Sequence, residues 1–191
     1  MNDLTRGGEI DEEDFLVRAD MICSLGRHVM ISNYHEYYRL VDYLSGITRG
    51  SKIGIILGIY NLEQVFDENY YSNLRGGILE AFGHLFGNNV HLYVYPSLKR
   101  GGQKIYTLDD IEVSFNLKHL LEFLKDNHKI KAIEGANTGI LHIISDDLLE
   151  MIELGDDGWE QYVPKKIELA IKEKKLLGYQ GTGDFSYEEV R

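Results

Sequence analysis

The sequence predicts an α/β fold with a mainly parallel sheet of three to five strands, covered by helices in a Rossmann-like arrangement. Short apolar runs of strand type alternate with segments whose apolar residues recur every three or four positions. The run Lys52–Ile59 is continuously apolar after its first residue, which is typical of a parallel strand covered on both faces. Short connections between these segments favour parallel strands joined by helical crossovers.

Three alternations of strand and helix account for the first half of the chain. The predicted strands are His28–Ile31, Lys52–Ile59 and Val90–Tyr95. The predicted helices cover residues 10–25 and segments that begin near Tyr37, Asn61 and Ile78. In the helix that begins near Tyr37, apolar residues follow at offsets of three, four, seven and ten positions, so they share one face.

The pattern is less regular beyond Pro96. Residues 104–113 are expected to pair with Val90–Tyr95 as an antiparallel edge hairpin. Further elements are expected as a helix around 117–124, a strand at Ile130–Ile133, a strand at Ile140–Ile144 and a helix opened by Ser145. We expect an α/β sheet domain over 1–154, with 155–191 as a helical extension and flexible tail of the same domain. Pro164 stands where a new helix would begin.

Composition limits the classes of partner. The chain of 191 residues has a formal net charge of −11, which opposes general binding to nucleic acid because such binding depends on phosphate neutralisation. No apolar run is long enough for a membrane span, and the first residues lack a signal peptide. The single cysteine cannot form an internal disulfide, which suits a reducing compartment. We therefore expect a cytoplasmic protein.

A candidate ligand site lies at the carboxyl ends of the predicted strands, where open α/β sheets usually bind ligands. The residues that follow these ends are Asn33, Tyr34, His35, Tyr60, Asn61 and Ser97. Backbone N–H groups at helix starts attract anions, so these positions suit a small anionic molecule such as a nucleotide or phosphorylated metabolite. The same residue types also occur simply as helix caps.

A basic stretch, YPSLKRGGQKIY over residues 95–106, is open to two interpretations. Lys99, Arg100 and Lys104 surround two glycines and have the charge needed to hold an anion. Gly-Gly is also a common pair in hairpin turns, and basic side chains at a hairpin tip are normally just solvated. Arg75 is a second basic candidate before a helix, although the glycines after it also serve to join two helical pieces.

The sequence offers little support for catalysis or metal binding. None of the seven histidines forms an HxxxH pair or a Cys-His cluster, so no metal site is expected. His35 is the best catalytic candidate because of its place after a predicted strand, but catalytic residues and cofactors stay unknown. The acidic pairs Asp146-Asp147 and Asp156-Asp157 have two possible explanations. They could hold a magnesium ion, or they could be present because the helix dipole favours acidic residues at a helix start. The thirteen tyrosines suit either a ligand cleft or a subunit interface.

Several segments resemble a family of uncharacterised bacterial proteins often labelled nicotinate-nucleotide adenylyltransferases. The matching stretches are GGEIDEEDFLVRADMICSLG, VMISNYHEYYRLVDYL, LEQVFDENYYSNLRGGILEAFGHLF and DDGWEQYVP. The resemblance implies a cytoplasmic α/β domain that is the C-terminal part of a longer polypeptide, which leaves open whether Met1 is the native start. The GxxxPxHxGH-type and ISSTxxR-type motifs of the adenylyltransferase superfamily are missing here, so no catalytic residue is carried over.

Three functions follow as hypotheses. The first is a domain that binds a small anionic ligand at the strand ends. The second is an oligomerisation or docking module that joins copies of the chain or a missing N-terminal domain. The third is part of a nicotinate-nucleotide adenylyltransferase-like enzyme, with His35 and an acidic pair as remote candidates.

Overall fold

The computed structural model of the chain describes residues 5–6, 9–10, 12–87, 89–99 and 101–181. Contacts divide the chain into two units, each described separately. The central unit is Ser32–His142, and the terminal unit combines Met1–Ile31 with Ile143–Arg191. No helix of the described residues is both long and apolar enough to cross a bilayer.

The central unit contains most of the strands. They are β3 (Ile53–Gly58), β4 (Val90–Tyr95), β5 (Ser97–Leu98), β6 (Ile105–Tyr106) and β7 (Ile130–Ala132). Its helices are α2 (Tyr37–Thr48), α3 (Ile59–Val65), α4 (Gly77–Phe86) and α5 (Lys118–Asp126). Short 3-10 turns occur at η1 (Glu68–Tyr71), η2 (Phe115–Leu117) and η3 (Thr138–Ile140).

A three-stranded parallel sheet forms the centre of this unit, in the order β3-β4-β7. Ile53 pairs with Val90 at one end of β3, Gly58 pairs with Tyr95 at the other, and Leu92 pairs with Ile130 on β7. The predicted α/β class with a parallel sheet is confirmed. Its strand number falls at the lower limit of the expected range.

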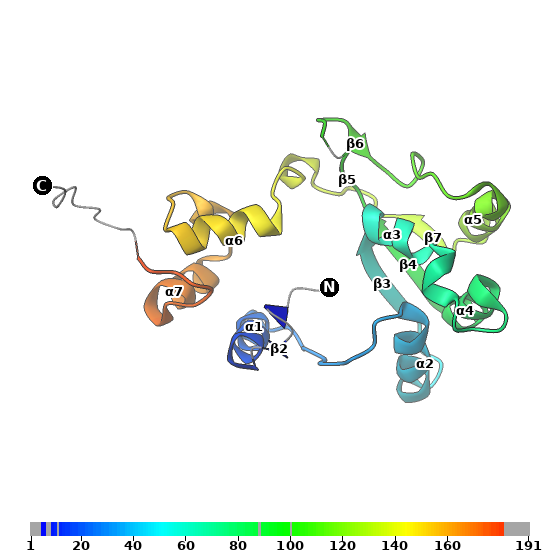
Figure 1. Ribbon diagram of the computed structural model, residues 1–191, viewed down its shortest axis with the longest axis horizontal. Coiled ribbons are helices and arrows are strands. Elements are labelled where there is room, and N and C mark those ends of the chain that lie inside the picture. The colour runs from blue at the N-terminus through cyan, green and yellow to red at the C-terminus, as the bar shows by residue number, and fades with distance from the viewer. Residues whose placement is uncertain (1–4, 7–8, 11, 88, 100, 182–191) are drawn as a thin grey trace, which may run out of the picture. The chain divides into compact units, whose positions relative to one another are not determined.

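Helices cover one face of the sheet. Figure 1 shows α3, α4 and α5 together on one side of β3, β4 and β7. The β4 side chains on that side, Val90, Leu92 and Val94, are at most 1% exposed. The apolar residues of α4 recur as Ile78, Ala81, Phe82 and Leu85, which places them on the helix face that packs here.

Helix α2 adds to the same side by packing on α4. Val41 of α2 is fully buried, and the Tyr38 ring lies 6.2 Å from the His84 ring. His84 Nδ1 also lies 3.0 Å from Asp42 Oδ2 at the edge of this contact. The core of the covered face is therefore built by α2 as well as by α3, α4 and α5.

The structure corrects four sequence-based expectations about strands. His28–Ile31 and Ile140–Ile144 form no strand; Met30, Ile31, Ile140 and Ile144 are exposed. The antiparallel hairpin exists, but β6 pairs with β5 as a separate two-stranded sheet and does not pair with Val90–Tyr95. The continuous apolar run of β3 is not covered on both faces, because Ile56 is 72% exposed.

The terminal unit is mainly helical. Its elements are β1 (Thr5–Arg6), β2 (Glu9–Ile10), α1 (Glu12–Ser24), α6 (Ser145–Leu154), η4 (Trp159–Tyr162) and α7 (Lys165–Lys174). Trp159, Ile152, Ile171 and Tyr179 form its core. The expected helical extension after residue 155 is present, with Pro164 immediately before α7. Contacts place α6 in the same unit, so the boundary at 154 stays a prediction about folding domains.

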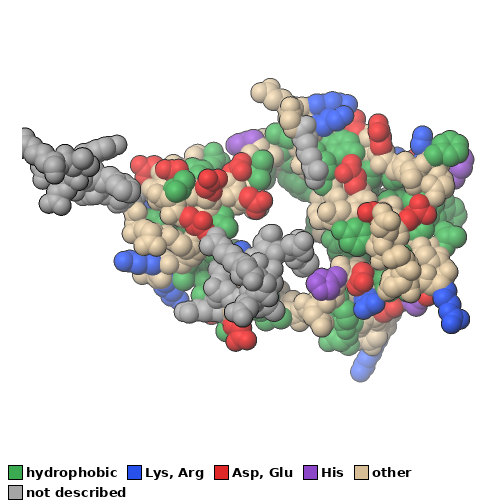
Figure 2. All heavy atoms as spheres, in the orientation of Figure 1, with side chains coloured by type: hydrophobic (Ala, Val, Ile, Leu, Met, Phe, Trp, Pro, Cys, Tyr) green, Lys and Arg blue, Asp and Glu red, His purple; other side chains and the backbone are tan. Residues whose placement is uncertain are grey.

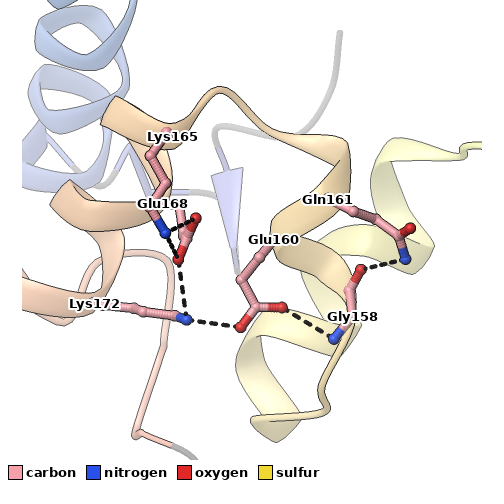
Figure 3. Close-up of polar contacts among 6 residues, drawn as sticks. All are labelled: Gly158, Glu160, Gln161, Lys165, Glu168 and Lys172. Atoms are coloured by element: carbon pink, nitrogen blue, oxygen red, sulfur yellow. Dashed lines mark hydrogen bonds and ion pairs between the residues drawn. The ribbon is translucent and has the colours of Figure 1, made fainter.

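A network of ion pairs joins η4 to α7 beside this core (Figure 3). Lys172 Nζ lies 2.7 Å from Glu160 Oε1 and 3.3 Å from Glu168 Oε1, and Lys165 Nζ lies 2.8 Å from Glu168. The hydrogen bond from Lys165 lowers the pKa of the nearly buried Glu168 carboxyl. Each charge in the network has an opposite partner, and the Lys172–Glu160 pair links α7 to η4.

Candidate functional site

The uncovered side of the sheet, here called the outer face, is the most distinctive surface of the central unit. Because strand side chains alternate, it carries the residues that do not point toward the helices. They are Lys52, Gly54 and Ile56 along β3, His91, Tyr93 and Tyr95 on β4, and Lys131 and Ile133 along β7. None of the β4 residues on this face belongs to the core cluster of the unit.

Tyr93 lies across the middle of the outer face. A Cβ atom added to Gly54 would be 3.1 Å from Tyr93 Cε2, so the ring rests directly on this glycine. Lys52 Nζ lies 6.0 Å from the centre of the same ring, within reach of a cation–π interaction. At the carboxyl end of β4, the Tyr95 hydroxyl donates to Asn137 O over 3.2 Å. The aromatic rings are thus held in place while Ile56 beside them stays exposed.

Positive charge surrounds His91 on the outer face. Burial lowers the pKa of His91, and the charges of Lys52, Lys129 and Lys131 lower it further. A neutral imidazole near pH 7 follows, since the ordinary pKa of histidine is about 6.5. The lysines therefore set the charge of this region, within a chain whose net charge is −11.

The predicted basic stretch forms a hairpin tip. Lys99 N–H donates to Lys104 O over 2.8 Å, and Gly101 adopts a φ of +72°, as the turn requires. Lys104 Nζ lies 2.9 Å from Asp110 Oδ1. The Thr107 hydroxyl and Lys104 hold the pKa of Asp110 at about 2. Lys104 is therefore committed to an ion pair, and Arg100 lies outside the described residues.

The hairpin lies next to the carboxyl ends of the parallel strands. The Tyr60 hydroxyl donates to Leu98 O over 3.0 Å, and the Tyr60 and Tyr106 rings are 5.5 Å apart. β5 follows β4 after one residue, Pro96, so Ser97 is held at the same edge. Figure 2 shows basic side chains over the hairpin. Tyr60 and the stretch from Ser97 to Lys99 are thus brought together, a proximity that the sequence left open.

The remaining candidate residues lie in other settings. Asn33, Tyr34 and His35 lead into α2 but follow no strand, and the Tyr34 ring packs 5.8 Å from Tyr43. Arg75 is exposed between η1 and α4. Asn61 is exposed on α3, with Oδ1 3.3 Å from the position of a Cβ on Gly58. As ligand-binding residues, all these candidates stay predictions.

An acidic cleft of about 390 Å³ lies beside the hairpin base. Its lining is Glu63, Phe66, Asp67, Glu68, Asn69, Glu112, Val113 and Ser114. The Tyr106 hydroxyl donates to Glu63 Oε1 over 2.6 Å, and burial, reinforced by this hydrogen bond, raises the pKa of Tyr106 to about 12. Four carboxylates repel an anion, so this cleft does not suit the predicted ligand. In the part of the chain that the structure describes, no group of three or more His, Cys, Asp or Glu residues is arranged to hold a metal ion.

Sequence reasoning missed the outer face, although β4 contains a signal for it. In VHLYVY, Val90, Leu92 and Val94 alternate with His91, Tyr93 and Tyr95, and this period of two indicates one covered and one open face. The continuous apolar run of β3 conceals the same alternation. Comparisons with protein-family models, with curated proteins and with solved structures gave no match.

Proposed function

We propose that the chain is a docking module that binds a second polypeptide on the outer face of the β3-β4-β7 sheet. The observation that carries this proposal is the 72% exposure of Ile56 on a parallel sheet, beside Tyr93 in register on β4. Parallel sheets occur almost only with both faces covered, whereas helices here cover one. A sheet face that carries tyrosine rings suits a protein partner, because tyrosines are favoured in the cores of interfaces.

Site-specific photocrosslinking in the cells that produce the chain tests this proposal. A benzoylphenylalanine at position 56 is expected to form an adduct whose crosslinked peptide, once sequenced, identifies one segment of another polypeptide. Position 79 provides the matched control, because Leu79 is 67% exposed on α4, on the opposite side of the sheet. No adduct at position 56, or the same adducts at both positions, would overturn the proposal. A sequenced peptide from the chain itself would replace docking by self-assembly.

A second candidate function is the binding of a small anionic molecule at the carboxyl ends of β3 and β4. The Tyr60–Leu98 hydrogen bond favours it, since it holds Lys99 of the hairpin beside these ends. In a thermal-shift panel of nucleotides and phosphorylated metabolites, a ligand at about 100 times its Kd adds about 2.7 kcal/mol, which is several degrees in Tm. Lys99→Ala is expected to abolish that shift, while Lys118→Ala, an exposed lysine on α5, keeps it. A panel without any shift would refute this function.

The resemblance to nicotinate-nucleotide adenylyltransferases stays a prediction. In the described residues of the central unit, His35 precedes α2 and follows no strand, which adds no support for its catalytic role. An activity of that kind would have to come from a longer polypeptide, in which the docking module proposed here would contact the catalytic part.

A further inference from the structure

The outer face has a charge that narrows the choice of partner, if the docking function proposed above holds. Lys52 precedes β3 and Lys131 lies on β7, and both belong to this face by strand alternation. Their charges, with that of Lys129, act together on His91 between them. A local positive surface on a chain with a net charge of −11 selects for acidic partners and against basic ones.

The dimensions of the face fit one helix. Neighbouring strands lie about 4.8 Å apart, so three strands make a face roughly 10 Å across. An α-helix with its side chains is about 10–12 Å wide. Ile56 and Tyr93, which are register partners on β3 and β4, supply an apolar strip for it. Helices are also the usual cover of parallel strands.

We propose that the occupant of the outer face is an acidic amphipathic helix of the partner polypeptide. Its apolar stripe packs on Ile56 and Tyr93, and its flanking carboxylates lie beside Lys52 and Lys131. Lys52 precedes β3, and Lys131 is level with Tyr93 and Ile56 in the strand register, so acidic residues are expected both beside the apolar contact and toward the amino end of β3.

Two other occupants fit the observations less well. Single-stranded nucleic acid uses aromatic rings and lysines on open sheets, but the net charge of −11 repels a polyphosphate backbone. A second copy of the chain, stacked by the same face, would bring like charges of Lys52 and Lys131 together, which costs free energy. Both occupants are outcomes of the test below.

Two designed peptides of about 18 residues, long enough for a helix to form in water, test the inference. Both carry the same leucine stripe; one is flanked by glutamates and the other by lysines. Fluorescence anisotropy with the full chain is expected to show binding of the acidic peptide at least about tenfold tighter than that of the basic peptide. The affinity of the acidic peptide for the chain should fall as the salt concentration rises, because its contacts with the lysines are electrostatic and partly exposed.

Charge reversal then places the binding on the outer face. Lys52→Glu/Lys131→Glu is expected to invert the peptide preference, while Lys118→Glu/Lys174→Glu, with the same change in net charge at exposed helix positions, keeps it. The inference would be overturned if the two peptides bound with equal affinity or if the charge reversal did not invert the preference. It would also be overturned if oligouridine bound more tightly than the acidic peptide, or if dimerisation of the chain blocked peptide binding. A crosslink from position 56 to a sequenced segment without an acidic helix would overturn the charge inference alone and leave docking intact.

Discussion

Trp159→Ala is expected to destabilise the terminal unit by about 3–5 kcal/mol, the usual cost of deleting a buried indole. Trp159 is 1% exposed and packs edge-on against Tyr179, with 5.9 Å between ring centroids. Lys172 Nζ lies 5.6 Å from the indole centre, so the substitution also removes a cation–π partner from the network in Figure 3. Hydrogen exchange of the α6 and α7 amides measures the loss, because it reports on this unit alone.

Leu154→Ala is the matched control for this experiment. Leu154 belongs to α6 but is 65% exposed, so its truncation is expected to cost no more than about 0.5 kcal/mol. If both variants exchanged at the same rate, Trp159 would not be the centre of the terminal core. The amides of β4 should keep their protection in both variants if the two units unfold separately.

Leu92→Ala is expected to cost the central unit about 2–5 kcal/mol, in the range found for buried leucines. Leu92 lies at the middle of the central strand, is fully buried and pairs with Ile130 of β7. Truncation leaves a cavity on the covered face of β4, which α3 and α4 contact, and the packed helices fill it only in part. Urea denaturation followed by circular dichroism gives the change in the free energy of unfolding.

Ile56→Ala on the neighbouring strand separates the two faces of the sheet. Ile56 is 72% exposed, so its truncation is expected to change stability by no more than about 0.5 kcal/mol. A cost as large as that of Leu92→Ala would mean that the outer face is already covered in the isolated chain. Such a result would also remove the surface on which the docking function depends.

Local pattern was sufficient for the main sheet but not for the isolated apolar runs. Residues 53–58, 90–95 and 130–132 have helices between them that bring them into register, and all three became strands. His28–Ile31 is also a short apolar run, but it lies at the end of the first segment of the terminal unit, and its backbone joins no sheet. A strand depends on a partner for its N–H and C=O groups, and composition does not reveal whether one exists.

The candidate site was predictable only in part for a similar reason. Gly101-Gly102 indicated the turn correctly, because a positive φ is a local requirement. The pairing of Lys104 with Asp110 depends on how the Thr107–Asp110 turn folds back, which the count of charges does not show. The outer face depends on which side the helices occupy, and only the alternation in β4 hinted at that choice.

The terminal unit is built from both ends of the chain, and this affects the order in which the protein forms during synthesis. Met21 of α1 packs on the core around Trp159, and Lys166 of α7 donates to Ser24 O over 2.6 Å. At about 5–20 residues per second, α1 leaves the ribosome on the order of ten seconds before α7. The central unit, Ser32–His142, is synthesised in between and can fold in that interval. Throughout it, α1 lacks the α7 contacts that it makes in the folded unit.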